Sequence, residues 1–134
     1  LGVLVVGLGG GAAAAFGMTG LETALSVVQQ TMVDTGRMTW ADVARVLSTA
    51  PARIGRIDEG ARPQGRPLEV GEPANVVLVD PTATRVVVPA EQATASANSP
   101  FGGHELPGAV VATFLRGRAT VFEGRPVEQA EVAR

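Results

Sequence analysis

A glycine-bearing loop that leads into an amphipathic helix is the feature that most constrains the fold of this chain. Phe16 and Gly17 open the loop. Thr19 and Glu22 have the spacing of a capping box, in which each side chain bonds a free backbone N–H at the helix start. Apolar residues then recur at steps of three and four, which predicts one buried helix face, and Gly36 is a natural stop. The residues of this face are Leu21, Ala24, Leu25, Val28 and Met32.

The start of such a helix has two interpretations. Its free N–H groups and positive dipole end favour an anionic or carbonyl ligand beside Phe16 and Gly17. A plain tight turn explains the same glycines without any ligand. Spacing alone favours the turn, because most helix starts bind only water.

Composition excludes several classes of protein. The 134 residues, of which 46% are hydrophobic, suit one domain or a piece of a larger one. The formal net charge is −2 and all the basic residues are scattered arginines, which argues against nucleic acid as a partner. The lack of cysteine excludes disulfides and thiolate metal sites, and His104 is the single histidine. The chain begins at Leu1, which is consistent with a partial sequence or a processed product.

The first 21 residues are uncharged, but seven of them are glycine, so a membrane span is not expected. We predict a buried strand over residues 1–6, of the continuous apolar kind that a parallel sheet uses. The glycines from Gly7 to Gly11 imitate a dinucleotide-binding fingerprint. This motif also needs a helix, a second strand and an acidic residue about 20 positions further on. Here the helix would meet Phe16 and Gly17 within a few residues and the next segment is another helix, so a small nucleotide-binding protein is the weaker alternative.

Two further helical segments are predicted before residue 57. Thr39 and Asp42 repeat the capping spacing, and Pro51 is expected to stop this helix at residue 49 or 50. A short turn closed by Gly55 should follow. The predicted inward face consists of Trp40, Val43, Val46 and Leu47.

The pattern changes to β beyond a segment rich in glycine, proline and charge, which marks a boundary. Strands are predicted over residues 75–80 and 84–88, with a polar loop over 90–107. A hairpin is predicted over residues 109–122, turning at Arg116 and Gly117. The last ten residues are expected to be a frayed tail.

Four segments, in this order, resemble class I dihydroorotases of the cyclic amidohydrolase superfamily. FGMTGLETAL, residues 16–25, resembles the last barrel helix, and LSTAPARI, residues 47–54, a helix end common to the superfamily. GEPANVVLVD, residues 71–80, is similar to the strand GxPADLVLxD, with Asn75 in place of the usual aspartate. SANSPF, residues 96–101, is similar to the loop SxNxPF, whereas residues 1–14 do not match the family.

The resemblance implies a fold of class α/β plus β. Its parts would be the C-terminal end of a (β/α)₈ metal-dependent hydrolase barrel in residues 1–57, a linker in 58–73, the C-terminal half of a composite β-sandwich in 74–124 and a tail in 125–134.

The implied function is that of a cytoplasmic enzyme of pyrimidine biosynthesis. Zinc would activate a water that hydrolyses the cyclic amide of dihydroorotate, and the reverse reaction would cyclise N-carbamoyl-aspartate. Phe16 and Gly17 would touch the substrate through backbone groups, which reverses the preference for a plain turn.

The catalytic machinery itself is not expected in this chain. The family uses a His-x-His pair, further histidines, an aspartate and often a carboxylated lysine, whereas this chain has one histidine and no lysine. We therefore predict no catalytic residue, no metal ligand and no activity of the chain alone. His104 is expected to be an exposed loop residue, and Asp34, Asp42 and Asp80 to cap helix or strand ends.

One alternative from the same family remains open. The chain could be a non-catalytic, dihydroorotase-like scaffold that binds aspartate transcarbamoylase. Self-association is also expected, because the two helix faces would lie on a barrel that is not in this chain. No nucleic acid and no membrane partner is predicted.

Overall fold

The computed structural model describes residues 17–127. Phe16, the predicted strand over residues 1–6, the glycines of residues 7–11 and most of the predicted tail lie outside these residues. Three short α-helices are present, two of them continuing into π-helical turns: α1 Ala24–Val28 with η1 Gln29–Val33, α2 Trp40–Ala44 with η2 Arg45–Thr49, and α3 Ala50–Ile54. The strands are β1 Val76–Val86, β2 Glu105–Leu115, β3 Arg118–Phe122 and β4 Arg125–Pro126, with a 3₁₀ turn η3 at Pro89–Glu91.

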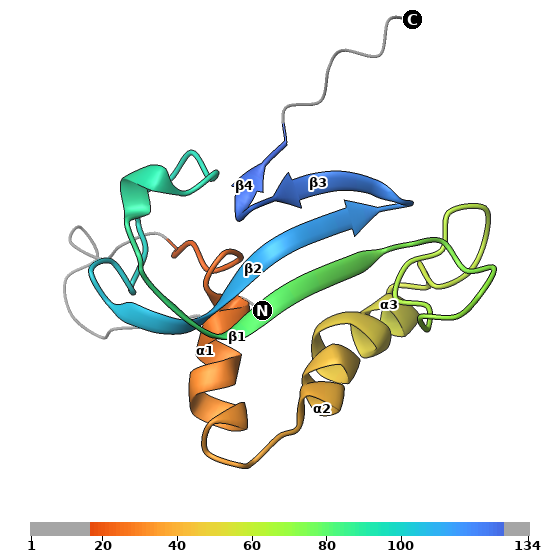
Figure 1. Ribbon diagram of the computed structural model, residues 1–134, viewed down its shortest axis with the longest axis horizontal. Coiled ribbons are helices and arrows are strands. Elements are labelled where there is room, and N and C mark those ends of the chain that lie inside the picture. Colours follow the sequence, from red (N-terminus) through yellow and green to blue (C-terminus); the bar gives the residue numbers. More distant parts are fainter. Residues whose placement is uncertain (1–16, 128–134) are drawn as a thin grey trace, which may run out of the picture.

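The four strands form one antiparallel sheet in the order β1-β2-β3-β4 (Figure 1). Each strand pairs with the next one in sequence, so the sheet is a meander and needs no crossover. The predicted hairpin is confirmed. Arg116 and Gly117 have φ angles of 50° and 78°, as a two-residue turn of the type favoured in hairpins requires.

The prediction of two separate strands over residues 75–80 and 84–88 is wrong, because β1 runs through both. Pro81 lacks the N–H of a sheet ladder, and the register with β2 shifts between Asp80 and Thr84. The Asp80 carboxylate accepts the Thr82 N–H at 2.8 Å, which satisfies the backbone at this irregularity. The strand therefore passes the proline as a bulge.

The second helical run also passes its proline. It begins at Thr39 as predicted, with a capping box between Thr39 and Asp42, and it ends at Gly55. It does not stop before Pro51. The π-helical segment η2, in which the Ala50 N–H bonds the Arg45 carbonyl, precedes the proline. Its wider turn accommodates a residue that lacks an N–H.

Helix α1 buries a polar face, which corrects the predicted apolar one. Leu21 is 94% exposed, whereas Thr23, Ser26 and Gln29 are at most 3% exposed. This face meets β2 at Gly108, whose carbonyl accepts the Ser26 hydroxyl at 3.3 Å. Gly108 has a φ of 78°, which disfavours any other residue, and a Cβ there would lie 2.3 Å from Oε1 of Gln29, so the buried Gln29 side chain would have to move. The predicted stop at Gly36 is confirmed by its φ of 72°.

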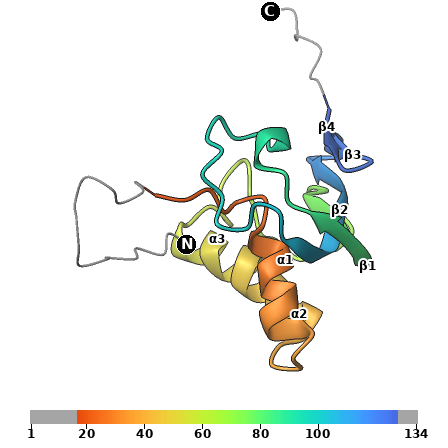
Figure 2. The same cartoon turned by 90° about the vertical axis from the view of Figure 1, so that its left-hand side faces the viewer.

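All three α-helices lie on the same side of the sheet (Figure 2). The buried apolar residues between and around these elements are few: Val43, Ala52, Val87, Leu106 and Ala112. Of the predicted inward face of the second helix, Val43 is buried, but Trp40 is 37% and Leu47 45% exposed. No helix within residues 17–127 is both long and apolar enough to cross a membrane.

Candidate functional site

The loop that begins at Gly17 is held in place by a loop distant in sequence. Gly17 has a φ of 74°, a conformation that other residues rarely adopt. The side-chain amide of Asn98 donates to its carbonyl oxygen. In return, the Asn98 carbonyl accepts the Thr19 N–H at 2.9 Å and the Thr19 hydroxyl at 3.3 Å. Asn98 thus bonds both sides of Met18, and the two loops lie side by side in Figures 1 and 2.

The predicted capping box at Thr19 and Glu22 is wrong, because both side chains bond the loop of residues 92–104 instead. Oε1 of Glu22 accepts the Ala93 N–H at 2.9 Å, and Arg85 donates to the Glu22 carbonyl. The helix begins later, at Ala24, with Thr23 at the N-cap and no side-chain capping bond. Gly17 therefore lies well before the N-terminus of α1, so a ligand at Gly17 cannot depend on the dipole of this helix.

The second loop, residues 92–104, is anchored at its base by Val87. The Val87 carbonyl accepts the Gly103 N–H at 2.8 Å, and the Val87 N–H donates to the His104 carbonyl at 2.9 Å. Val87 is 1% exposed, so this base is part of the core. Within the loop, the Asn98 N–H donates to the Ser96 hydroxyl at 3.3 Å. The loop thus presents Asn98 from a fixed base.

His104 lies in this loop and is exposed, as predicted. Its ring packs edge-on against Phe101 with 6.3 Å between the ring centroids.

A small cavity of about 190 Å³ opens beside the two loops. It is lined by residues 18–22 together with Gln92 and Thr94. Oε1 of Gln92 is buried, and nothing in the described part of the chain donates a hydrogen bond to it. Enclosed sites for drug-sized ligands occupy roughly 300–1,000 Å³. This cavity is smaller, so it is a partial site at most.

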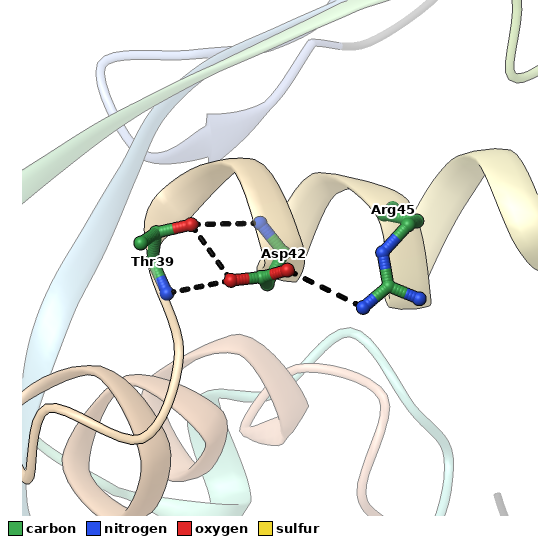
Figure 3. Close-up of polar contacts among 3 residues, drawn as sticks. All are labelled: Thr39, Asp42 and Arg45. Carbon is green, nitrogen blue, oxygen red and sulfur yellow. Dashed lines mark hydrogen bonds and ion pairs between the residues drawn. The ribbon is translucent and has the colours of Figure 1, made fainter.

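Asp42 is committed to helix capping (Figure 3). The Thr39 N–H donates to its carboxylate at 3.0 Å, the Thr39 hydroxyl at 2.8 Å and Arg45 at 3.3 Å. The backbone bond from Thr39, followed by the other two, lowers the pKa of Asp42 below its ordinary 3.8. The predicted capping role of Asp42 is confirmed.

Asp80 is held in the same way by its neighbour. The Thr82 hydroxyl and then the Thr82 N–H lower the pKa of this carboxyl. Asp34 occupies the C-cap position of η1, at the end of the first helical run. Asp34 and Asp42 thus lie at helix ends as predicted, whereas the prediction for Asp80 is wrong, because this residue lies within β1 at its bulge and not at a strand end.

Sequence comparison pairs this chain with dihydroorotases. The dihydroorotase of Mycobacterium tuberculosis is 55% identical over 114 residues, which are 85% of this chain and 26% of that protein. The dihydroorotase of Leifsonia xyli is 53% identical over 122 residues, 91% of this chain and 27% of that protein. This chain is a dihydroorotase homologue. It spans about a quarter of the length of the dihydroorotases it matches. No family model matches it.

The fold of the dihydroorotase homologue agrees with this relationship. The L-hydantoinase (dihydropyrimidinase) from Arthrobacter aurescens superimposes on 85% of the chain with a TM-score of 0.74 and 28% sequence identity. The chain covers 24% of that structure. The homologue therefore has the fold of part of a cyclic amidohydrolase, with an antiparallel sheet.

The donor set of a zinc centre is not found in the part that the structure describes. Residues 17–127 of the homologue contain no group of three His, Cys, Asp or Glu side chains that could hold a metal ion. The described residues therefore do not fit zinc, which needs at least three protein ligands in a catalytic site.

Sequence patterns did not reveal the role of Asn98. Its only signal was its place in the SANSPF segment, because a single exposed asparagine has no pattern of its own. Gly17 is found in the conformation that the glycine suggested, whereas no observation tests its predicted contact with a substrate.

Proposed function

We propose that this chain forms part of a dihydroorotase and supplies the loop at Gly17 that contacts the substrate. The observation that supports the proposal is the positioned Gly17 peptide. Its φ of 74° is secured by Asn98, and a Cβ added there would meet nothing within 4 Å. A backbone free of a side chain lets a small substrate approach closely. The 55% identity to a dihydroorotase supports a substrate of the class that such an enzyme would act on, a cyclic amide that bears a carboxylate.

In this proposal residues 17–57 form the end of a (β/α)₈ barrel and residues 74–124 part of a β-sandwich, joined by residues 58–73. The arrangement of the helices on one side of the antiparallel sheet supports this division. Active sites of such barrels lie on the loops between strands and helices, as the loop before α1 would.

The intact enzyme would need zinc, which supplies a water of lowered pKa for attack on the ring amide. Because residues 17–127 do not fit a zinc site, no step of the reaction is assigned to them through the metal. The described part contributes binding and orientation of the substrate. A cytoplasmic location follows from the same proposal, and the partnership with aspartate transcarbamoylase stays a prediction.

The test is a hybrid enzyme in which the matching part of this chain replaces the corresponding 114 residues of the Mycobacterium tuberculosis dihydroorotase. We expect zinc-dependent hydrolysis of dihydroorotate with a kcat/KM within about tenfold of that enzyme, because tenfold is only about 1.4 kcal/mol of transition-state stabilisation. The control is the same enzyme with those residues deleted, which should be inactive. A hybrid that melts cooperatively but does not hydrolyse dihydroorotate would overturn the proposal.

A further inference from the structure

The carbonyl group of Gly17 is already engaged by the protein. The side-chain amide of Asn98 donates to this oxygen across 81 positions of sequence. Among residues 17–127, by contrast, no oxygen accepts a hydrogen bond from the Gly17 N–H. The two backbone groups of Gly17 therefore differ: its carbonyl oxygen is bound to Asn98, whereas its N–H has no partner among residues 17–127.

We propose that Asn98 is a positioning residue, which fixes the Gly17 backbone so that its N–H points at an acceptor oxygen of the substrate. This inference rests on the proposed function, in which the loop touches a cyclic amide with a carboxylate. That substrate carries several acceptor oxygens, and a backbone N–H is their natural donor. Binding the Gly17 carbonyl from the other side stops the backbone from rotating between conformations that glycine otherwise adopts freely.

The chemistry of asparagine suits this task. Its side-chain Nδ2 donates to the Gly17 carbonyl, while its backbone carbonyl, which any residue would supply, accepts the Thr19 N–H at 2.9 Å. The contact with Gly17 is therefore the one that depends on the amide side chain. The Asn98 backbone is itself held by Ser96 at 3.3 Å. An aspartate has nearly the same shape but cannot donate, and its charge would repel the Gly17 carbonyl.

Because the hydrogen bond between Asn98 and Gly17 lies at the surface, its effect on substrate binding can be measured apart from its effect on folding stability. Asn98 and Gly17 are exposed and Thr19 is partly exposed, and Asn98 lies in a loop whose base is anchored independently at Val87. Removing an exposed hydrogen bond costs little folding free energy, whereas a loop displaced from its substrate loses binding directly.

The experiment compares Asn98→Asp with Asn75→Asp in the hybrid enzyme. Both variants exchange an amide for a carboxylate, and Asn75 lies in another part of the molecule, between Pro63 and Arg116. We expect Asn98→Asp to raise the KM for dihydroorotate roughly tenfold, with kcat changed much less and Tm unchanged. Asn75→Asp should lower Tm and leave KM unchanged.

A double-mutant cycle then tests whether Asn98 acts through Gly17. If it does, Asn98→Ala and Gly17→Ala together should cost much less than the product of their separate effects on kcat/KM. Independent effects, or an Asn98→Asp variant with the KM of the parent hybrid, would overturn the positioning role and leave the proposed function intact. A folded parent hybrid without activity would overturn both.

Discussion

Asn75 connects two segments of the chain through one side-chain amide. Its Nδ2 donates to the Pro63 carbonyl at 3.0 Å, and its Oδ1 accepts the Arg116 N–H at 2.9 Å. The residue therefore ties the segment before β1 to the turn between β2 and β3. An aspartate, the residue usual at this position in the sequences that this segment resembles, could accept from Arg116 but could not donate to Pro63.

We therefore expect Asn75→Asp to lower the free energy of unfolding of the hybrid enzyme by about 0.5–1.5 kcal/mol, the net worth of one hydrogen bond. The measurement is a thermal or urea melt. Asn75→Ala loses both bonds and should be less stable still. Equal stability of all three proteins would show that the amide bridge does not form.

A substitution at Gly17 distinguishes a role in substrate binding from a purely conformational need for glycine. Gly17→Val should reduce kcat/KM of the hybrid far more than its stability, because a side chain there blocks the approach of the substrate. Gly60 is the matched control, since both glycines have positive φ, 74° and 84°, and neither would bring an added Cβ within 4 Å of another atom. Gly60→Val suffers the same strain, at a site distant in sequence from the loop. If Gly17→Val has the kinetics of the parent hybrid, the loop is only a tight turn and does not contact the substrate.

A substitution at Leu106 should have the opposite effect to Gly17→Val, with a loss of stability and little change in KM. It is 3% exposed, whereas Leu25 of the predicted apolar face is only half-buried, so Leu106 is the better probe of the core. Leu106→Ala should cost about 2–5 kcal/mol of stability, as buried leucine truncations do. Molecules that remain folded should keep the KM of the parent hybrid. A large change in KM would contradict the separation of core and site.

At the scale of elements, two similar capping patterns have different outcomes. Thr39 and Asp42 cap their helix as the spacing predicts. Thr19 and Glu22 have the same spacing, yet Asn98 and Ala93 bond them instead. The spacing of residues indicates only which hydrogen bonds can form within a segment. The partners of Thr19 and Glu22 lie more than seventy positions away, so sequence patterns could not reveal that these bonds replace the capping bonds.

The same limit explains the other differences in the fold. The sequence predicts the hairpin at Arg116 and Gly117 correctly, because a turn depends on its own residues. The predictions at the two prolines are wrong. A π-helical turn lets the helical run continue past Pro51, and a bulge lets β1 continue past Pro81. The prediction for the buried side of α1 is also wrong, because this side packs on β2 at Gly108, which lies 82 positions from its hydrogen-bond partner Ser26.

The capping box at Asp42 predicts a specific pH dependence. Its folded-state pKa lies below the ordinary 3.8, so its contribution to helix stability is fully present above that value. This contribution is lost as pH falls through the folded pKa. The melting temperatures of the parent hybrid and of Asp42→Asn should therefore differ by a constant amount near neutral pH and converge below pH 3.8. A difference that persists unchanged to about pH 2 would contradict the role of the carboxylate.

At the scale of the whole molecule, the described part exposes much of what a core would bury. Val77, Leu78 and Val86 of β1 and Phe122 of β3 are each 49–57% exposed. Exposed apolar area of this kind promotes association. In the proposed enzyme, segments outside this chain would cover it, since the dihydroorotases that match are about four times as long as the matched part.

The isolated 134-residue chain should therefore bind a hydrophobic dye or self-associate. Dye fluorescence and analytical ultracentrifugation measure both, with the hybrid enzyme as the control that should bind much less dye. A clean monomer with a sharp, cooperative melt and no dye binding would show that the chain folds on its own.

The central proposal is that this chain supplies a substrate loop of a dihydroorotase, whereas its residues 17–127 provide no metal site. The most direct measurement is the rate of dihydroorotate hydrolysis by the purified chain in the presence of zinc, compared with the hybrid enzyme at equal concentration. We expect the chain alone to show no hydrolysis above the background rate, because without bound metal it has no activated water. Zinc-dependent turnover by the isolated chain would contradict the claim.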